Sequence, residues 1–286
     1  MKISIIDKKD IDISVENSTI KCDDIKLPFK LVDTLIVVNS AKIYSKDIIK
    51  IADNGINVIF LNSYSNKSAI IQSTNPKSAD LKLKQYNALE KRVEIAKYII
   101  QEKILRHAIQ LKENGIDLDT TDYIDTLHVA NNIETILGIE GSFAREYFKH
   151  YFRLIPLKFH KSKRTKRPPL DPANALLSYF YFMLYNIIST KLISYGFEPS
   201  ISYLHTPFRD HMALSSDLLE LYREQINQLV ISLFKEKVIN INHFQKRGGV
   251  YLKYDGKKAL HRSLMELWQK LDPKINAEIA NLKAML

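Results

Sequence analysis

The sequence predicts an α+β protein of two domains, in which a small N-terminal β-rich domain is followed by a larger all-α-helical domain. Short apolar stretches with the period of strands occupy the chain up to about residue 62. Residues 63–80 are rich in Ser and Asn and contain a proline, which favours a connection or a loose hairpin. Beyond them, apolar residues recur with the period of a helix. We therefore place the domains at 1–75 and 76–286.

The N-terminal domain is expected to consist mainly of short strands. The stretches KISII, IDISVE and STIKC predict strands, and the continuous apolar stretches TLIVVN and NVIFLN predict buried ones. The polar DKKD between the first two strands predicts a hairpin turn. One helix is expected at SKDIIKIADNG, with Ser45 as its N-cap and Gly55 as its C-terminal stop.

The second domain is expected to be helical almost throughout. A long amphipathic stretch begins near residue 80 and ends at Gly115. Further helices are expected at 121–136, 139–152, 172–194, 211–236 and 258–271. Asp171 before Pro172 is a typical start for the third of these, and we expect the aromatic residues around that helix to be core. Residues 243–258 contain two glycines and the alternating VYLKY, which predicts a short hairpin.

Composition restricts the class of protein. A chain of 286 residues with 45% hydrophobic content is typical of a globular protein. We find no apolar run near the roughly 18 to 20 residues that cross a membrane, and the N-terminus has acids where a signal peptide would be apolar. We therefore expect a cytoplasmic protein. The single cysteine, Cys22, excludes an internal disulfide and the zinc sites that need several thiolates.

The charge of the chain favours a polyanionic partner. The formal net charge is +10, from 42 Lys and Arg against 32 Asp and Glu. Residues 1–75 hold ten Lys and nine acids, so almost all of the surplus belongs to the second domain. We expect that domain to bind an anion such as nucleic acid, although a basic protein without such a partner remains an alternative.

Three acids and one histidine are candidates for chemistry. Asp217 and Glu220 are three residues apart on one helix face, where like charges repel unless a Lys, an Arg or a metal ion lies between them. Glu140 is expected in the first turn of the helix at 139–152, where the helix dipole alone would favour it. The adjacent Gly141 costs the helix about 1 kcal/mol and often marks a close approach.

Carboxylates with one imidazole and open water positions suit Mg²⁺ or Mn²⁺, and a histidine such as His205 favours Mn²⁺. Such an ion would serve phosphoryl transfer, because it activates an oxygen nucleophile and stabilises charge on the phosphate. The alternative is that these groups form an ordinary solvated surface.

A basic segment lies between the acids in the sequence and runs into a double proline, so it must be a loop. Its basic residues are Lys158, Lys161, Lys163, Arg164, Lys166 and Arg167. Beside a metal site they would bind DNA phosphates and make binding depend on salt. Without such a site they would be a solvated loop.

Five stretches, in their order and spacing, resemble the CRISPR-associated integrase of spacer acquisition, the "Cas one" family. They are IAKYIIQEKI (95–104), GIEGSFAREYF (138–148), RPPLDPANALLSYFYFMLY (167–185), GFEPSISYLH (196–205) and LSSDLLELYR (214–223). The resemblance covers most of the helical domain and, more loosely, the β-rich domain.

The resemblance implies a divalent-metal site, with Mg²⁺ or Mn²⁺ held by Glu140, His205 and Glu220. Asp217 matches a family aspartate that lies near the metal. The family often has a Gly-Arg pair where this chain has residues 208–210 (Phe208, Arg209, Asp210), which affects the loop geometry. The last ligand is commonly aspartate, whereas it is glutamate here, which changes only the reach of that side chain.

The resemblance also implies a reaction and partners. The 3′-hydroxyl of a short captured DNA with 3′ overhangs attacks a phosphodiester at the CRISPR leader-repeat junction, and no covalent protein–DNA intermediate forms. Family members are homodimers through the β-rich domain, and two such dimers flank a dimer of a small partner, "Cas two", in a heterohexamer. A structure-selective nuclease of branched DNA and a non-catalytic DNA-binding scaffold remain alternatives.

Overall fold

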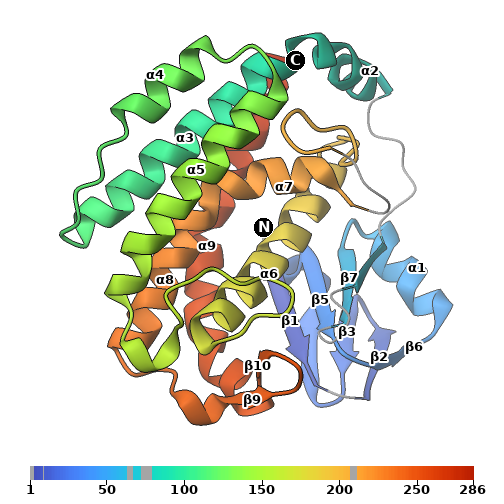
Figure 1. The fold of residues 1–286 in the computed structure, drawn as a ribbon. Coiled ribbons are helices and arrows are strands. Elements are labelled where there is room, and N and C mark those ends of the chain that lie inside the picture. The colour runs from blue at the N-terminus through green and yellow to red at the C-terminus, as the bar shows by residue number, and fades with distance from the viewer. Residues whose placement is uncertain (1–2, 9, 63–66, 72–78, 207–210) are drawn as a thin grey trace. The chain divides into compact units, whose positions relative to one another are not determined.

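The protein forms two compact units, Met1–Ala79 and Asp80–Leu286 (Figure 1). The structure is a computed structural model, and it describes residues 3–8, 10–62, 67–71, 79–206 and 211–286. The first unit is rich in strands and the second is helical, which confirms the predicted fold class. The boundary expected at residue 75 and most of the expected connection lie outside the described residues.

The described residues of the first unit form two four-stranded sheets and one helix. The elements are β1 (Ile3–Asp7), β2 (Ile11–Glu16), β3 (Thr19–Cys22), β4 (Ile25–Pro28), β5 (Thr34–Val38), β6 (Ala41–Ile43), α1 (Ser45–Asp53), β7 (Asn57–Asn62) and β8 (Lys67–Ile71), with a short 3₁₀ turn at Phe29–Leu31. The strand orders are β1-β5-β7-β8 and β4-β3-β2-β6. The core takes side chains from both sheets and α1, and it includes the free thiol of Cys22.

The hairpin expected between the first two strands is wrong. β1 pairs in parallel with β5, whereas β2 pairs with β3 and β6 in the other sheet. β5 is buried at every position and is apolar after Thr34, so it takes an inner place and needs a partner on each side. The hairpin turn is instead at Asn17 and Ser18, which adopt positive φ angles of 45° and 56°.

The helix of the first unit matches its prediction except at its start. α1 begins at Ser45, so Tyr44 is the N-cap and Ser45 is the first helical residue. Gly55 follows the helix with φ of 76°, a conformation that glycine adopts without strain, and the predicted stop is confirmed.

The second unit is built from helices and one hairpin. The elements are α2 (Ala79–Asn87), α3 (Arg92–Glu113), α4 (Thr121–Val129), α5 (Ile133–Tyr151), α6 (Pro172–Ser194), α7 (Ala213–Leu219), α8 (Arg223–Lys235), β9 (Phe244–Lys246), β10 (Val250–Leu252) and α9 (Tyr254–Met285). Short 3₁₀ turns lie at η2 (Ala88–Lys91), η3 (Phe152–Leu154), η4 (Leu157–Phe159), η5 (Glu220–Tyr222) and η6 (Ile241–His243). The strands β9 and β10 confirm the predicted hairpin. In Figure 1, α3 lies against α5 and α8, and α8 lies against α9.

Several predicted helices have different bounds. The turn η2 interrupts the long first helix, and the turn η5 divides the helix expected at 211–236. α9 continues to Met285 with Pro273 inside it, beyond the expected end at 271. α5 begins at Ile133 because the side chain of Asn132 accepts a hydrogen bond from the backbone N–H of Thr135 at 2.8 Å.

The helix at 172–194 is confirmed residue for residue. Asp171 is its N-cap and accepts a hydrogen bond from the backbone N–H of Asn174 at 2.8 Å, with Pro172 at the first position. By length and composition α6 could span a membrane, which corrects the expectation that no such stretch exists. Its apolar window is 72% buried within the protein, and a core helix passes the same test. Phe180 and Tyr181 are buried, as expected of core aromatics, whereas Tyr179, Phe182 and Tyr185 are only partly buried.

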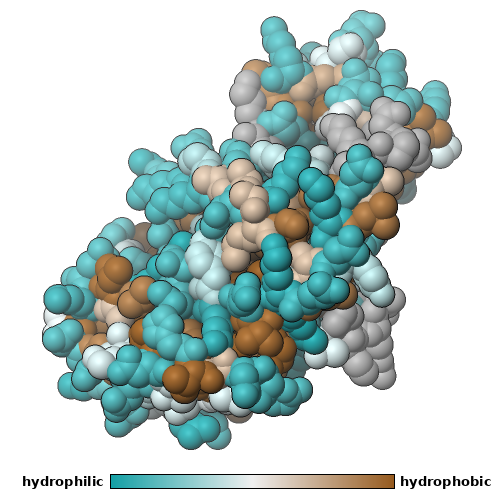
Figure 2. Space-filling model, turned by 90° about the horizontal axis from the view of Figure 1, so that it is seen from above, coloured by the Kyte–Doolittle hydropathy of each residue, from teal (hydrophilic) through white to brown (hydrophobic). Residues whose placement is uncertain are grey.

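The surface of the protein mixes hydrophilic and apolar residues. On the face shown in Figure 2, hydrophilic side chains predominate and apolar ones are scattered between them. Scattered apolar residues are ordinary on a protein surface and need no special explanation.

Candidate active site

Two of the predicted acids meet at a lysine of α3. Glu140 comes from α5 and Glu220 from the turn η5. Lys103 Nζ lies 2.6 Å from Glu220 Oε2 and donates a hydrogen bond to Glu140 Oε1. The lysine is 5% exposed and Glu220 is 4% exposed, so the charges are withdrawn from water. The cation expected between neighbouring acids therefore lies between Glu140 and Glu220, not between Asp217 and Glu220.

A second cation completes the charge balance of this cluster. Arg223 Nη2 lies 2.8 Å from Glu220 Oε1, and its guanidinium lies over the ring of Tyr181 at 4.5 Å. Burial alone would raise the pKa of Glu220, but Arg223 and Lys103 outweigh it and hold that pKa well below its usual value. Burial would lower the pKa of Lys103, but Glu220 and Glu140 outweigh it and raise that pKa. These groups are therefore charged at neutral pH.

Asp217 holds the segment that carries His205. Its buried carboxylate accepts hydrogen bonds from the backbone N–H groups of Tyr203 at 2.8 Å, Leu204 at 3.0 Å and His205 at 3.0 Å. His205 Nδ1 lies 2.8 Å from Asp217 Oδ1. Both oxygens of Asp217 thus accept hydrogen bonds. The contact with His205 requires a proton on Nδ1, so Nε2 carries none and is available as a ligand. A carboxylate that orients a histidine in this way is typical beside metal sites.

Other contacts support the same segment. Ser202 Oγ donates a hydrogen bond to the carbonyl of His205 at 2.5 Å, and Arg92 Nε donates one to the carbonyl of Tyr203 at 2.8 Å. His205 also favours the ionised form of Glu220 and so lowers its pKa, after the larger effects of burial and the two cations. The histidine therefore lies within electrostatic range of Glu220. Residues 208–210, where the chain departs from the family pattern, lie outside the described residues.

A divalent metal ion must be tested against this geometry. In the stretches of chain that the structure describes, no group of three or more His, Cys, Asp or Glu side chains lies close enough to hold an ion. Glu140 and Glu220 nevertheless converge on one positive atom, and Glu220 Oε2 is buried without a well-formed hydrogen bond. The ammonium of Lys103 is close enough to this oxygen for an ion pair, but the angle between them does not meet that of a hydrogen bond. The oxygens and the imidazole suit Mg²⁺ or Mn²⁺, and the ligand set stays a prediction.

The position of Glu140 differs from the prediction. It lies within α5, more than one turn after Ile133, so the dipole at the helix start does not account for it. A Cβ at Gly141 would meet nothing within 4 Å, so the close approach expected there does not come from the described chain. A side chain at this position would point into open space.

The basic loop divides into exposed and enclosed side chains. Lys158, Lys161, Lys163, Lys166 and Arg167 are exposed. Arg164 instead turns toward α6, where its guanidinium donates hydrogen bonds to Asn174 Oδ1 at 2.9 Å and Ser178 Oγ at 3.3 Å. The structure therefore places Arg164 as an anchor of the loop.

One exposed lysine of the loop lies close to the acid cluster. Partial loss of solvent lowers the pKa of Lys166, and Arg223 and Arg164 lower it further. Glu220 and Glu140 act in the opposite direction, so both acids lie within electrostatic range of this side chain. The predicted binding of phosphates by this loop stays a prediction.

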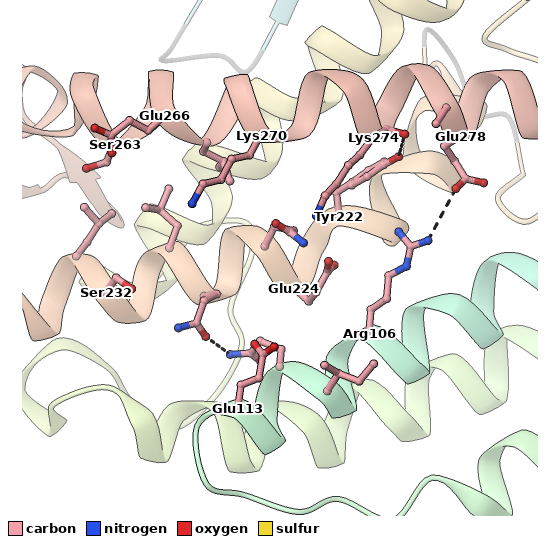
Figure 3. Close-up of a pocket in the computed structure, with 18 of the residues that line it drawn as sticks. Arg106, Glu113, Tyr222, Glu224, Ser232, Ser263, Glu266, Lys270, Lys274 and Glu278 are labelled. Atoms are coloured by element: carbon pink, nitrogen blue, oxygen red, sulfur yellow. Dashed lines mark hydrogen bonds and ion pairs between the residues drawn. The ribbon is translucent and has the colours of Figure 1, made fainter.

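A groove with many charged residues in its lining lies beside α3 (Figure 3). It has a volume of about 870 Å³ and is lined by residues of α3, η5, α8 and α9. Arg106 Nη2 lies 2.8 Å from Glu102 and 3.8 Å from Glu278, and its Nη1 donates a hydrogen bond to the carbonyl of Leu221 at 2.8 Å. Glu224 is buried in the same groove. α3 therefore contacts η5 through both Lys103 and Arg106.

Sequence reasoning did not assign Lys103 or Arg223, although both lie within the stretches that carry the resemblance. The signal for Lys103 was present, because it shares the helical period of the buried Ile99, Ile100 and Ile104. A lysine on an apolar face needs a buried partner.

The chain is similar to known proteins over almost its whole length. The family described as CRISPR associated protein Cas1 matches residues 3–266. The protein named CRISPR-associated endonuclease Cas1 1 of Thermodesulfovibrio yellowstonii is 31% identical, and the match covers 94% of this chain and 91% of the relative.

Solved structures show the same fold. A Cas1 protein from Thermotoga maritima superposes with a TM-score of 0.91 at 23% identity, over 99% of this chain and 96% of the other. A casposase bound to integration product superposes with a TM-score of 0.83 at 21% identity, over 93% of this chain and 82% of the other.

Proposed function

The chain belongs to the CRISPR-associated Cas1 family of endonucleases and integrases, and on this basis we propose that it is a divalent-metal-dependent DNA integrase of CRISPR adaptation. Its reaction is transesterification, in which the 3′-hydroxyl ends of short prespacer DNA are joined to the CRISPR leader-repeat. Hydrolysis by the same site would give endonuclease activity. The observation that carries the proposal is the convergence of Glu140 and Glu220 on one buried cation. Asp217, three residues before Glu220, holds the segment that carries His205.

The residues of the cluster have distinct roles in this proposal. Glu140, Glu220 and Nε2 of His205 hold Mg²⁺ or Mn²⁺. The ion supplies stabilisation of negative charge on the scissile phosphate and activation of the attacking hydroxyl. Asp217 is a positioning residue, because its oxygens fix the imidazole and the backbone at 203–205. No Ser or Tyr nucleophile is required, since DNA oxygen attacks phosphorus directly.

Exposed lysines of the basic loop would bind the DNA backbone beside the acids. Lys161, Lys163, Lys166 and Arg167 are available for phosphates, whereas Arg164 keeps the loop on α6. Contacts of this kind give affinity and position without sequence preference. DNA binding should therefore weaken steeply with salt.

The partners follow from the family resemblance. We propose that the protein acts in the cytoplasm as a homodimer formed by its N-terminal unit, and that two dimers flank a dimer of the small "Cas two" partner. The fold shared with a casposase bound to integration product supports an integrase over other DNA-binding classes.

The test uses the purified protein, alone and with its partner. It is mixed with a short duplex bearing 3′ overhangs and a supercoiled CRISPR plasmid, in Mn²⁺, Mg²⁺ or EDTA. We expect relaxed plasmid with the duplex covalently attached, and loss of attachment in EDTA. Nicking without attachment would instead identify a nuclease of branched DNA, and binding without any reaction would identify a scaffold.

Glu140→Ala separates catalysis from binding. Joining should be abolished while DNA affinity is retained, because affinity rests on Lys and Arg contacts with phosphates. Glu134→Ala, in the first turn of the same helix, is the matched control and should keep joining activity. If Glu140→Ala lost DNA binding and joining together with its circular dichroism unchanged, this division of roles would be wrong.

A further inference from the structure

Lys103 is an internal counter-ion at a site that is proposed to hold a metal ion. Its ammonium contacts Glu140 and Glu220, which come from different elements, and the side chain is almost fully enclosed. With Arg223 on the other oxygen of Glu220, two negative and two positive groups balance one another. The cluster is thus electrically complete without a metal ion.

The positive charges already beside these acids oppose the binding of a divalent cation. Lys103 and Arg223 already set two positive charges against the two carboxylates. A divalent ion would therefore add positive charge to a balanced cluster. Like charges a few ångströms apart repel strongly where water is excluded.

We propose that Lys103 makes metal binding depend on DNA: without DNA its ammonium competes with a divalent ion for Glu140 and Glu220, and the phosphates of bound DNA relieve this competition. The proposal rests on the integrase function proposed above and assigns a regulatory role to a residue of the same site. The flexible four-carbon stem of lysine allows its charge to change partner, which a rigid group would not allow.

Linkage gives the proposal a measurable form. If DNA strengthens metal binding by a certain factor, the metal must strengthen DNA binding by the same factor. The share of this coupling that belongs to Lys103 is the part lost when its charge is removed. A lysine that served only to hold the helices together would not change the coupling.

The first measurement uses the wild-type protein alone. Mn²⁺ affinity is measured by electron paramagnetic resonance with and without a duplex whose 3′ ends are dideoxy-terminated, so that no reaction occurs. We expect DNA to tighten Mn²⁺ binding by about 5- to 150-fold, the usual range for coupled sites. Equal Mn²⁺ affinity with and without DNA would overturn the proposal, whatever the variants do.

The second measurement compares Lys103→Met with Lys112→Met, an exposed lysine of the same helix, as the matched control. Without DNA, Lys103→Met should bind Mn²⁺ about tenfold more tightly than wild type, and the gain on adding DNA should shrink correspondingly. Its melting temperature in EDTA should fall, because two carboxylates lose their shared cation, and Mn²⁺ should restore it. Lys112→Met should match wild type in every respect.

The outcomes separate this proposal from the proposed function. If the wild type binds DNA and Mn²⁺ but Lys103→Met leaves the coupling unchanged, only the role of Lys103 is wrong. If the wild type shows coupling but joins no DNA, the integrase function is wrong while the counter-ion role stands.

Discussion

Asp217→Asn provides a direct test of whether Asp217 is a support or a ligand. The substitution keeps the size of the side chain but replaces one acceptor oxygen with an NH₂ donor. In the wild type, Oδ2 accepts from the backbone N–H groups of Tyr203 and Leu204. Oδ1 accepts from the backbone N–H of His205 and contacts its Nδ1. Whichever way the amide is turned, its NH₂ group faces at least one backbone N–H donor.

The size of the effect follows from these contacts. The least costly arrangement keeps the oxygen toward Tyr203 and Leu204, which leaves the N–H of His205 without an acceptor and the imidazole in the other tautomer. An unsatisfied buried donor and the loss of charge-assisted bonds together cost about 2–4 kcal/mol. For a unit of this size, the melting temperature should fall by about 5–15 °C.

Thermal unfolding followed by circular dichroism in EDTA measures this cost without any contribution from metal. His205→Ala is the matched control, because it removes the contact with the ring but leaves the three backbone hydrogen bonds to Asp217. It should melt close to wild type, since the side chain of His205 is 31% exposed. If Asp217→Asn melted within about 2 °C of wild type yet lost Mn²⁺ binding, Asp217 would be a ligand and the present reasoning would be refuted.

Two other substitutions separate structural from functional charges. Lys163→Ala should weaken DNA binding and reduce its salt dependence without changing stability. Arg164→Ala should instead lower stability by about 1–3 kcal/mol, because it loses hydrogen bonds to α6. Equal effects of the two substitutions on DNA affinity and on melting would contradict this. Burial raises the pKa of Glu224, so its ionised form destabilises the fold as pH rises above the usual glutamate range. Glu224→Gln should therefore raise the melting temperature more at about pH 8 than at about pH 5, because only the higher pH favours the ionised form. A difference that does not change with pH would argue against a buried charge.

The sequence predicted those elements whose signals are local. α6 was predicted at both ends because Asp171 and Pro172 mark its start and the apolar stretch is continuous. The hairpin after β1 failed because strand pairing is set by distant residues. β5 pairs with β1 and β7, which are distant in the sequence, and no local turn motif predicts this pairing. The break expected between residues 136 and 139 was misplaced, because α5 starts at the cap formed by Asn132 and continues through Gly138 and Gly141.

The candidate site was predicted in part. The resemblance named Glu140 and Glu220, and the structure brings both to one cation. The spacing of Asp217 and Glu220 on one face suggested a shared ion. Instead, the helix changes to a 3₁₀ turn at Glu220, and Asp217 serves the backbone of the histidine segment. A three-residue spacing fixes the face of a regular helix, but it does not fix what each side chain contacts.

The assignment of Lys103 shows what kind of sequence signal indicates a site of this type. The residue occupies a position that the helical period gives to the core, between isoleucines of the same stripe. A buried charge is strongly unfavourable unless an opposite charge meets it, so a lysine there requires an acid from a neighbouring element. The helical period of α3 alone therefore predicts a buried ion pair. It cannot choose the acid, because the choice depends on the packing of α3 against α5 and η5, and this packing brings two acids to the same ammonium. One cation shared by two acids is also the arrangement that a divalent ion would have to replace, which is why Lys103 is the residue to test first.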